Sequence, residues 1–313
     1  MAKYIFGVDI GGTTVKIGLF ESDGALKDKW EITTRTDEGG KYILTDIAAS
    51  LDAKLNETGI DKSDVVGIGM GVPGPVKGDG TVLRCVNLGW GIFNVEDELS
   101  SLTGLKVKAG NDANMAALGE MWQGGGKGFE NIVMVTLGTG VGGGIILDGK
   151  MLSGVNGAGG EIGHIEVDDS ETEVCGCGKK GCLEQYASAT GIVRMANIEL
   201  NNTDRPSVLR SVQYISAKEI FDAAKNGDDL AMEIVENHGK CLGKALAQIA
   251  CTVDPEVFVI GGGVSKAGDV LIKTVQKHFR ENAFHACKET KFALATLGND
   301  AGIYGGACAI LNS

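Results

Sequence analysis

The stretch KYIFGVDIGGTTVKIGLF, residues 3–20, predicts a strand over 4–10, a tight turn over 11–14 and a second strand over 15–20. Adjacent glycines let the backbone of such a turn point its N–H groups at an anion, and the threonines add hydroxyl donors. Asp9 lies at the end of the first strand, where its carboxylate is placed to hold Mg²⁺. An ordinary hairpin turn is the alternative for this stretch taken alone. The residues expected to contact a phosphate are Gly11, Gly12, Thr13 and Thr14.

Strands and helices are predicted to alternate through the rest of the first half. Apolar residues recur every four positions over 43–55, which predicts one face of an amphipathic helix with Gly59 as its C-cap. Asn111 or Asp112 is the predicted N-cap of a later helix. The predicted elements are strands over 26–34, 65–70 and 105–109 and helices over 40–59 and 113–122.

The second half begins like the first, with a strand over 132–137, a glycine-rich turn over 138–140 and a strand over 141–147. This turn is also compatible with a β-bulge or a crowded strand crossing. Helices dominate afterwards, notably over 228–253, before an expected final strand over 257–260 that runs into three glycines and suits a closely approaching nucleotide. None of the three loops has Walker A or Rossmann spacing, but three such loops in one chain favour nucleotide binding. The repeated order of strands followed by helices indicates two α/β lobes. The expected contacts in the second half are Gly138, Thr139, Gly140, Gly142, Gly261, Gly262 and Gly263.

Composition narrows the class of protein. The chain has 313 residues, 43% of them hydrophobic, which is enough for two packed domains. Its net charge of −12 and pI near 4.9 argue against a nucleic-acid surface, because such a surface needs a basic stripe. No run reaches the roughly 18 apolar residues of a membrane span, and the N-terminus lacks the pattern of a signal peptide. We therefore expect a cytoplasmic protein with reduced thiols.

Three of the eight cysteines lie close together, in the stretch Cys175-Gly-Cys177-Gly-Lys-Lys-Gly-Cys182. In a reducing compartment such spacing indicates a metal site rather than a disulfide. With His164 these thiolates would fill the tetrahedral shell of Zn²⁺ and leave no open position, which is typical of a structural metal. Unligated reduced cysteines are the alternative. The other cysteines, expected to be free and buried, are Cys85, Cys241, Cys251, Cys287 and Cys308.

Three carboxylates complete the candidate set: Asp112, Glu161 and Glu184. Glu161 and Glu184 flank the cysteine cluster in sequence, so folding this loop around an ion would bring them together. Asp112 has a structural alternative, because Asp at a helix N-cap is common. The two roles of Asp112 are compatible if a substrate binds at that end of the helix.

Taken in order, these motifs resemble the ROK family of sugar kinases and repressors, over Val8 to about Ala309. The most specific part is Glu161-Ile162-Gly163-His164, followed by Cys-x-Cys-Gly-x-x-Gly-Cys-x-Glu at 175–184. The resemblance implies an α/β protein with the actin-like ATPase (ribonuclease H-like) fold, in which two lobes enclose a central cleft. It also implies that the last helix returns to the first lobe.

The resemblance further implies how the chain divides. Residues 1–112, with about 298–313, would form the smaller N-terminal lobe. Residues 113–297 would form the larger lobe, with the zinc loop, the sugar site and the adenosine site. The implied positions for ATP phosphates and Mg²⁺ are Asp9, 11–14 and 138–144, and those for the adenosine are 261–265.

The sugar site is also implied by the resemblance. Asp112 would act as general base, and His164 would use one ring nitrogen for zinc and the other for the sugar. Many members carry Lys directly after Gly-Gly-Thr, where this chain has Thr14, and Lys16 follows only two residues later, so a phosphate contact by Lys16 is not implied. The implied sugar-binding residues are Asn87, Asn111, Asp112, Glu161, His164 and Glu184.

The activity implied by the resemblance is ATP-dependent phosphorylation of glucose at O6, with Mg²⁺ and one structural Zn²⁺ per chain, in a homodimer. A ROK kinase for fructose, mannose or N-acetylmannosamine is the first alternative, because hydroxyl selectivity depends on fine geometry. A sugar-responsive repressor is the second, although such repressors carry a DNA-binding extension where this chain has about two residues before its first strand. Neither a nucleic acid nor a membrane is expected as a partner.

Overall fold

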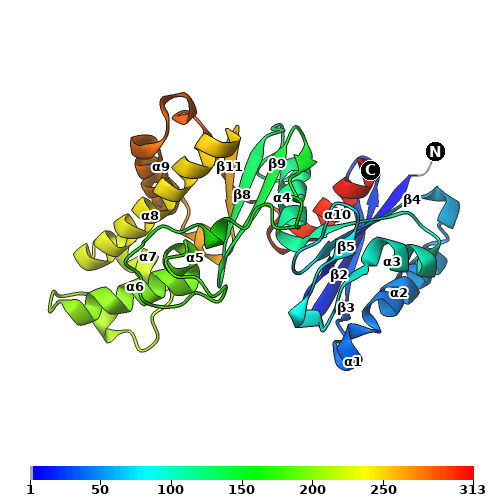
Figure 1. Ribbon diagram of the computed structural model, residues 1–313, viewed down its shortest axis with the longest axis horizontal. Coiled ribbons are helices and arrows are strands. Elements are labelled where there is room, and N and C mark those ends of the chain that lie inside the picture. Colours follow the sequence, from blue (N-terminus) through cyan, green and yellow to red (C-terminus); the bar gives the residue numbers. More distant parts are fainter. Residues whose placement is uncertain (1–2) are drawn as a thin grey trace. The chain divides into compact units, whose positions relative to one another are not determined.

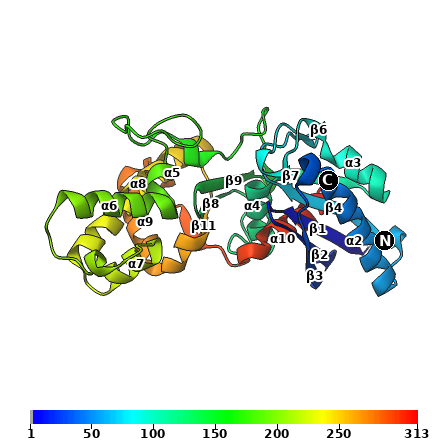
Figure 2. The same cartoon turned by 90° about the horizontal axis from the view of Figure 1, so that it is seen from below.

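The computed structural model describes residues 3–313, which fold into two compact units (Figures 1 and 2). Unit 1 consists of the chain up to Glu130 together with Gly144–Gly160 and Thr296–Ser313. Unit 2 consists of Asn131–Gly143 and Glu161–Ala295. Strands and helices alternate in both units, which confirms the predicted α/β class.

Unit 1 is built on a sheet with the strands β1 (Tyr4–Ile10), β2 (Thr14–Glu21), β3 (Leu26–Thr33), β4 (Val65–Val72) and β7 (Val107–Asn111). Their order is β3-β2-β1-β4-β7, with β1, β4 and β7 parallel and β2 and β3 antiparallel to their neighbours. The register places Asp9 opposite Gly71 and Val72 opposite Asn111, so the carboxyl ends of three parallel strands meet at one edge. Ligands of open α/β sheets bind at such an edge. A separate short pair consists of β5 (Thr81–Val82) and β6 (Phe93–Asn94).

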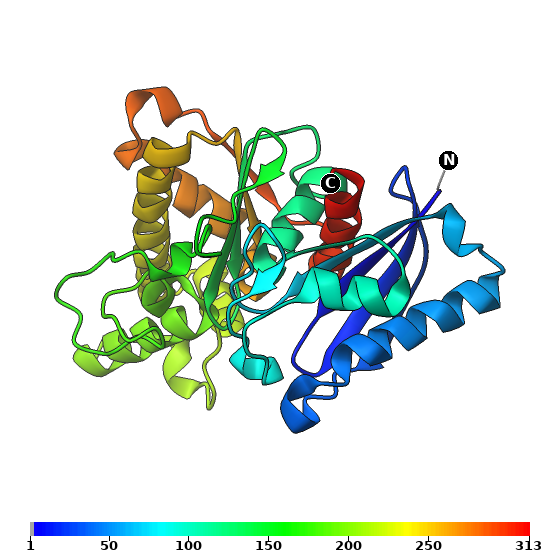
Figure 3. The same cartoon turned by 45° about the vertical axis from the view of Figure 1, so that its right-hand side comes forward.

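Helices cover both faces of this sheet, as Figure 3 shows. They are α1 (Asp37–Gly40), α2 (Ile43–Thr58), α3 (Val95–Thr103), α4 (Asp112–Gln123) and α10 (Ala301–Leu311). Side chains alternate along β1: Phe6 and Val8 join the core that contains α2 and α3, whereas Ile5 packs with Ile303 of α10. Asp9 therefore points to the α10 face. The predicted helix end is confirmed, because Gly59 caps α2 with a φ of 67°.

Three glycines let α10 approach the sheet and α4 closely. A Cβ on Gly7 would lie 1.9 Å from the Ile303 carbonyl oxygen, and one on Gly69 would lie 1.7 Å from that of Gly306. A Cβ on Gly305 would lie 1.7 Å from the Met115 carbonyl oxygen in α4. These distances are far below van der Waals contact, so no larger residue fits there without moving the helix. The last helix, α10, packs against β1, β4 and α4 and groups with unit 1.

The second sheet has the order β10-β9-β8-β11-β12, and β8, β11 and β12 are parallel. Its strands are β8 (Ile132–Leu137), β9 (Val141–Leu147), β10 (Lys150–Met151), β11 (Val257–Gly261) and β12 (Lys291–Leu294). Phe258 of β11, Phe292 of β12 and Phe279 form a ring cluster in unit 2 with centroids 5.2–5.5 Å apart. The helices of unit 2 are α5 (Glu184–Ala187), α6 (Ala189–Asn202), α7 (Ala217–Lys225), α8 (Asp229–Val253) and α9 (Asp269–Asn282).

Two features differ from the sequence prediction. The strand over 257–260 is not the last, because the edge strand β12 follows it. Only four residues long and partly exposed, β12 gives no apolar pattern of its own. Among the scattered cysteines, Cys251 is exposed, so the expectation that all are buried was wrong.

The unit boundaries also fall elsewhere than at Asp112. Residues 113–130 and 144–160 group with unit 1. The physical reason is that α4 packs against α10, and the buried carboxylate of Glu120 in α4 accepts the N–H groups of Thr296 and Leu297 at 3.0 and 2.8 Å. These contacts join α4 to the segment leading into α10, so α4 belongs to unit 1.

Candidate active site

The first glycine turn, between β1 and β2, is closed by hydrogen bonds. The Gly11 N–H donates to the Thr14 carbonyl at 2.9 Å. Thr34, a nearly buried residue, holds the other side: its hydroxyl donates to the Gly11 carbonyl at 2.7 Å and its N–H to the Thr13 carbonyl at 2.9 Å. Gly12 and Thr13 are exposed at the tip, so the turn offers a rigid backbone to a ligand. Thr34 was not predicted, because a threonine at a strand end gives no distinctive signal.

Asp9 is tightly enclosed by glycines. A Cβ on Gly302, at the start of α10, would lie 2.5 Å from the Asp9 carboxyl carbon. A Cβ on Gly71 would lie 3.4 Å from Asp9 Oδ1 and 3.5 Å from the Asp112 Cα. Burial and, to a smaller extent, the Asp112 carboxylate raise the pKa of Asp9 to about 6, against the opposing effect of the Lys16 amine. A buried carboxylate with a raised pKa beside a second acid is an environment that a divalent cation would relieve.

Asn111 and Asp112 begin α4 at the end of β7. Of the two predicted N-cap candidates, Asn111 is the cap, and its Oδ1 accepts the N–H groups of Ala113 and Asn114 at 3.0 and 3.2 Å. Its amide donates to the Gly74 carbonyl at 3.1 Å. Asp112 Oδ1 accepts the Ala113 N–H at 2.8 Å, and the residue is half-buried. The capping function thus belongs to Asn111, and Asp112 is the carboxylate next to Asp9.

Asn87 lies in a short 3-10 turn, Val86–Leu88, and is exposed. The turn adjoins the Asn111 contact, because a Cβ on Gly74 would lie 3.0 Å from the Arg84 carbonyl oxygen. Lys16, by contrast, donates its amine to the Asn299 carbonyl at 2.9 Å. Asn87 and Lys16 thus occupy different surroundings within unit 1.

In unit 2, the ligand atoms of His164, Cys175, Cys177 and Cys182 all lie within 4.8 Å of one another. The Cys177 and Cys182 sulfurs are 3.6 Å apart, and His164 Nδ1 lies 3.8 Å from the Cys175 sulfur. Burial raises the pKa of the Cys182 thiol to about 12, with the neighbouring thiols adding to it. Binding of a metal ion would displace that proton. The predicted grouping is confirmed, and the four residues could hold a metal ion.

Glu184, the first residue of α5, lies between this cluster and the second glycine turn. Its Oε2 accepts the Val141 N–H at 3.0 Å, and its Oε1 is 3.8 Å from the Cys175 sulfur. A Cβ on Gly140 would lie 2.0 Å from Glu184 Oε2, so a side chain there would displace the Glu184 carboxylate. Glu161 is exposed and precedes His164 by one turn, in which the His164 N–H donates to the Glu161 carbonyl at 3.2 Å.

The second and third glycine loops lie together at the carboxyl edge of β8 and β11. The start of α6 binds the carbonyls of the second turn: the Ala189 N–H donates to Gly138 at 2.8 Å, and the Thr190 hydroxyl to Thr139 at 2.7 Å. In the third loop, Gly262 has a φ of 81°, and a Cβ there would lie 2.5 Å from the Leu137 carbonyl oxygen. Gly261 pairs with Thr136, and Gly263 begins a 3-10 turn. Gly142 lies half-buried in β9.

A pocket of about 560 Å³ in unit 2 opens beside these groups. Its lining includes Thr139, Gly140, Cys175, Glu184, Thr190 and Arg194. Neither Thr190 nor Arg194 was predicted, because both lie in a helix without a motif. Within residues 3–313, no helix is long and apolar enough to cross a membrane.

Comparison with known proteins identifies the family. Residues 5–312 match the ROK family. The glucokinase of Halalkalibacterium halodurans is 46% identical over 311 residues, which cover 97% of this chain and 94% of that protein. The glucokinase of Thermotoga maritima is 36% identical over 98% of this chain and 96% of its own length. The crystal structure of a ROK family glucokinase from Streptomyces griseus in complex with glucose and AMPPNP has a TM-score of 0.73 at 34% identity, covering 97% of this chain and 98% of that one.

Proposed function

The chain belongs to the ROK family, and from this premise we propose that it is a glucokinase, which transfers the γ-phosphoryl group of ATP to O6 of glucose. The actin-like ATPase fold of the family carries this chemistry. The observation that carries the proposal is the pair of carboxylates at the ends of β1 and β7, Asp9 and Asp112, on either side of Gly71. One acid suits a metal ion and the other a substrate hydroxyl.

We assign the general base to Asp112. A sugar hydroxyl has a pKa far above 7, so its attack on phosphorus needs a carboxylate aligned with the attacking oxygen. Asn111 Oδ1 accepts two first-turn N–H groups, including the Ala113 N–H that Asp112 Oδ1 also accepts. The Asp112 carboxylate would accept the O6 proton as O6 attacks in line, and Asn111 would bind the sugar beside it. We also assign the exposed Asn87 to the sugar.

We assign phosphate binding to backbone N–H groups rather than to lysines, because the chain has a net charge of −12. We propose that the 11–14 turn and the loops at 138–142 and 261–263 bind ATP, the last of them at the adenosine. Bound Mg²⁺ would neutralise developing charge on the phosphates. Asp9 would hold this ion, mostly through water, and its raised pKa fits a site that becomes favourable when a cation enters.

The cysteine cluster fits one structural Zn²⁺. Two sulfurs on a tetrahedral Zn²⁺ lie about 3.8 Å apart for Zn–S bonds of about 2.3 Å. The 3.6 Å between the sulfurs of Cys177 and Cys182 comes close to this edge length. Because Nδ1 faces the sulfurs, Nε2 of His164 would be the nitrogen that binds a sugar hydroxyl, together with the carboxylates of Glu161 and Glu184.

Two further properties stay predictions. We propose a homodimer, as is frequent in the family, which size-exclusion chromatography with light scattering would test. The cytoplasmic location expected from the sequence is the other, and fractionation of cells would test it.

A panel of hexoses with Mg·ATP tests the choice of sugar. We expect kcat/KM for glucose to exceed that for mannose, fructose and N-acetylmannosamine by about tenfold, because a buried polar group left unpaired costs roughly 1–3 kcal/mol. A better rate with another sugar would overturn the glucose assignment and leave a ROK kinase. Failure to phosphorylate any sugar would instead favour a sugar-binding regulator.

A further inference from the structure

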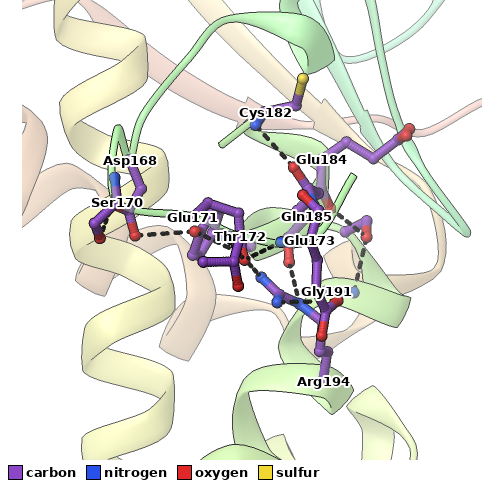
Figure 4. Close-up of polar contacts among 12 residues, drawn as sticks. Asp168, Ser170, Glu171, Thr172, Glu173, Cys182, Glu184, Gln185, Gly191 and Arg194 are labelled. Carbon is purple, nitrogen blue, oxygen red and sulfur yellow. Dashed lines mark hydrogen bonds and ion pairs between the residues drawn. The ribbon is translucent and has the colours of Figure 1, made fainter. Parts of the chain in front are cut away.

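The loop that carries the cysteines is shaped by side chains rather than by secondary structure. Between His164 and Cys175, the segment 168–173 contains neither helix nor strand. Figure 4 shows that polar side chains from α5 and α6 converge on it. We call this group the Glu171 clamp, and its members are Asp168, Glu171, Gln185, Tyr186 and Arg194.

Glu171 is the centre of the clamp. Its Oε1 accepts the N–H groups of Thr172 and Glu173 at 2.9 and 3.0 Å, which curls the segment around the carboxylate. Its Oε2 accepts Arg194 Nη2 at 2.5 Å and the Tyr186 hydroxyl at 2.7 Å. The side chain is 8% exposed, and the Arg194 hydrogen bond is the main cause that lowers the pKa of Glu171 to about 2. A carboxylate this buried and this fully hydrogen-bonded specifies one conformation of the loop.

The Arg194 guanidinium contacts both the 168–173 segment and α5. Besides Glu171, it contacts the Glu173 carboxylate at 3.3 Å and donates Nε to the Gln185 carbonyl at 3.3 Å. Its guanidinium lies 5.2 Å from the centre of the Tyr186 ring. A lysine, with one compact ammonium, could not make this planar set of contacts.

Gln185 connects the clamp to the cysteine cluster. Its Oε1 accepts the Cys182 N–H at 3.0 Å, and its Nε2 donates to the Glu173 carbonyl at 3.1 Å. One side chain thus fixes the backbone two residues before Cys175 and at Cys182. The neighbouring Glu184 carries the contact to Val141 of the second glycine turn.

We propose that Arg194 is a positioning residue. Through the Glu171 clamp it would hold Cys175 in the position that binds zinc and Glu184 in the position that binds sugar. The sugar part of this inference rests on the proposed glucokinase activity, and the zinc part rests on the proposed structural Zn²⁺. Partners outside the ligand shell typically change metal affinity by about 10–100-fold when they are removed. Without the clamp, binding of sugar or zinc would first have to order the 168–173 segment, so affinity would fall while chemistry on bound substrate would change little.

Arg194→Met, which keeps the apolar stem, is the test variant. Arg205→Met is its control, because Arg205 forms an exposed ion pair with Glu233 in the same unit and lies outside the clamp. The readouts are hydrogen exchange of 168–175, zinc release to a chromogenic chelator, and KM and kcat for glucose. We expect exchange and zinc release at least about tenfold faster and KM for glucose about tenfold higher, with kcat and KM for ATP within about threefold.

Further variants keep the proposal falsifiable if Arg194→Met folds poorly. Tyr186→Phe removes one hydroxyl and should shift the same readouts in the same direction by a smaller factor. Arg194→Lys should not restore the wild-type values, and Glu171→Gln combined with Arg194→Met should be no worse than either alone. Unchanged exchange over 168–175 would overturn the proposal. Equal losses in kcat and in both KM values would also overturn it, by showing general destabilisation. A wild-type protein that never phosphorylates glucose would refute the proposed function but leave exchange and zinc release as valid tests of the clamp.

Discussion

Replacing Asp9 with Asn should abolish phosphoryl transfer and yet stabilise the fold. The carboxylate is confined by Gly71 and Gly302, and burial, with help from Asp112, raises its pKa from 3.8 to about 6. An acid whose pKa is raised in the folded protein binds its proton more tightly there than in the unfolded chain. Stability is therefore lost as the pH rises from about 3.8 to about 6, and the loss stays constant above that. Asparagine has no charge to bury.

The size of the effect follows from the pKa. A rise from 3.8 to about 6 is about two units, and each unit corresponds to about 1.4 kcal/mol. The ionised carboxylate thus costs up to about 3 kcal/mol at pH 7.5, and water at the partly exposed Asp9 brings the expected gain to about 1–2 kcal/mol. At pH 5 folded Asp9 is mostly protonated, so the gain should be about half as large.

Urea unfolding followed by tryptophan fluorescence, at pH 7.5 and pH 5 without added Mg²⁺, measures this gain. The control is Asp204→Asn, at an exposed residue of unit 2, which should leave the free energy of unfolding unchanged within about 0.5 kcal/mol. An Asp9→Asn protein no more stable than wild type at pH 7.5 would refute the reasoning. A gain of the same size at both pH values would refute it as well.

Three other changes test the remaining assignments. Asp112→Asn should lower kcat by about 10²–10⁴ with the Kd of glucose, measured by calorimetry, nearly unchanged; more than a tenth of the wild-type kcat would mean that another residue is the base. Elemental analysis should find about one zinc per chain, and Cys177→Ser should lower both the zinc content and the Tm; a fully active metal-free protein would contradict this. Glu184→Gln, whose amide oxygen can still accept the Val141 N–H, should raise KM for glucose several-fold and leave kcat within about threefold; a larger fall in kcat than rise in KM would assign Glu184 to the chemistry.

Features with a local signal were predictable from the sequence. The apolar period that ends at Gly59 gave α2, and the two strand–glycine–strand stretches gave β1, β2, β8 and β9. The cysteine spacing predicted the cluster with His164, because four soft ligands on a short glycine-rich loop have few other arrangements. Asn111 and Asp112 were both identified, and the structure assigned the cap to the first of them.

Features that depend on contacts between distant segments were not predictable. Glu120 lies in an ordinary helix, and only the fold brings Thr296 and Leu297 to its carboxylate, which moves the unit boundary away from Asp112. Glu171 and Arg194 are 23 residues apart in sequence and follow no period, so nothing marks them as a buried pair. In the sequence, Gly302 is not distinguishable from the other glycines of α10, because its contact with Asp9 of β1 arises only in the folded protein.

The measurement that tests the central claim most directly couples glucose phosphorylation to glucose-6-phosphate dehydrogenase, with purified protein, Mg·ATP and NADP⁺. The coupling enzyme reports transfer to O6, because it oxidises glucose 6-phosphate and not glucose 1-phosphate. We predict that NADPH forms in proportion to the ATP consumed, and that the Asp112→Asn protein slows its formation by at least about 10². ATP consumption without NADPH, or NADPH formation that Asp112→Asn does not slow, would contradict the account.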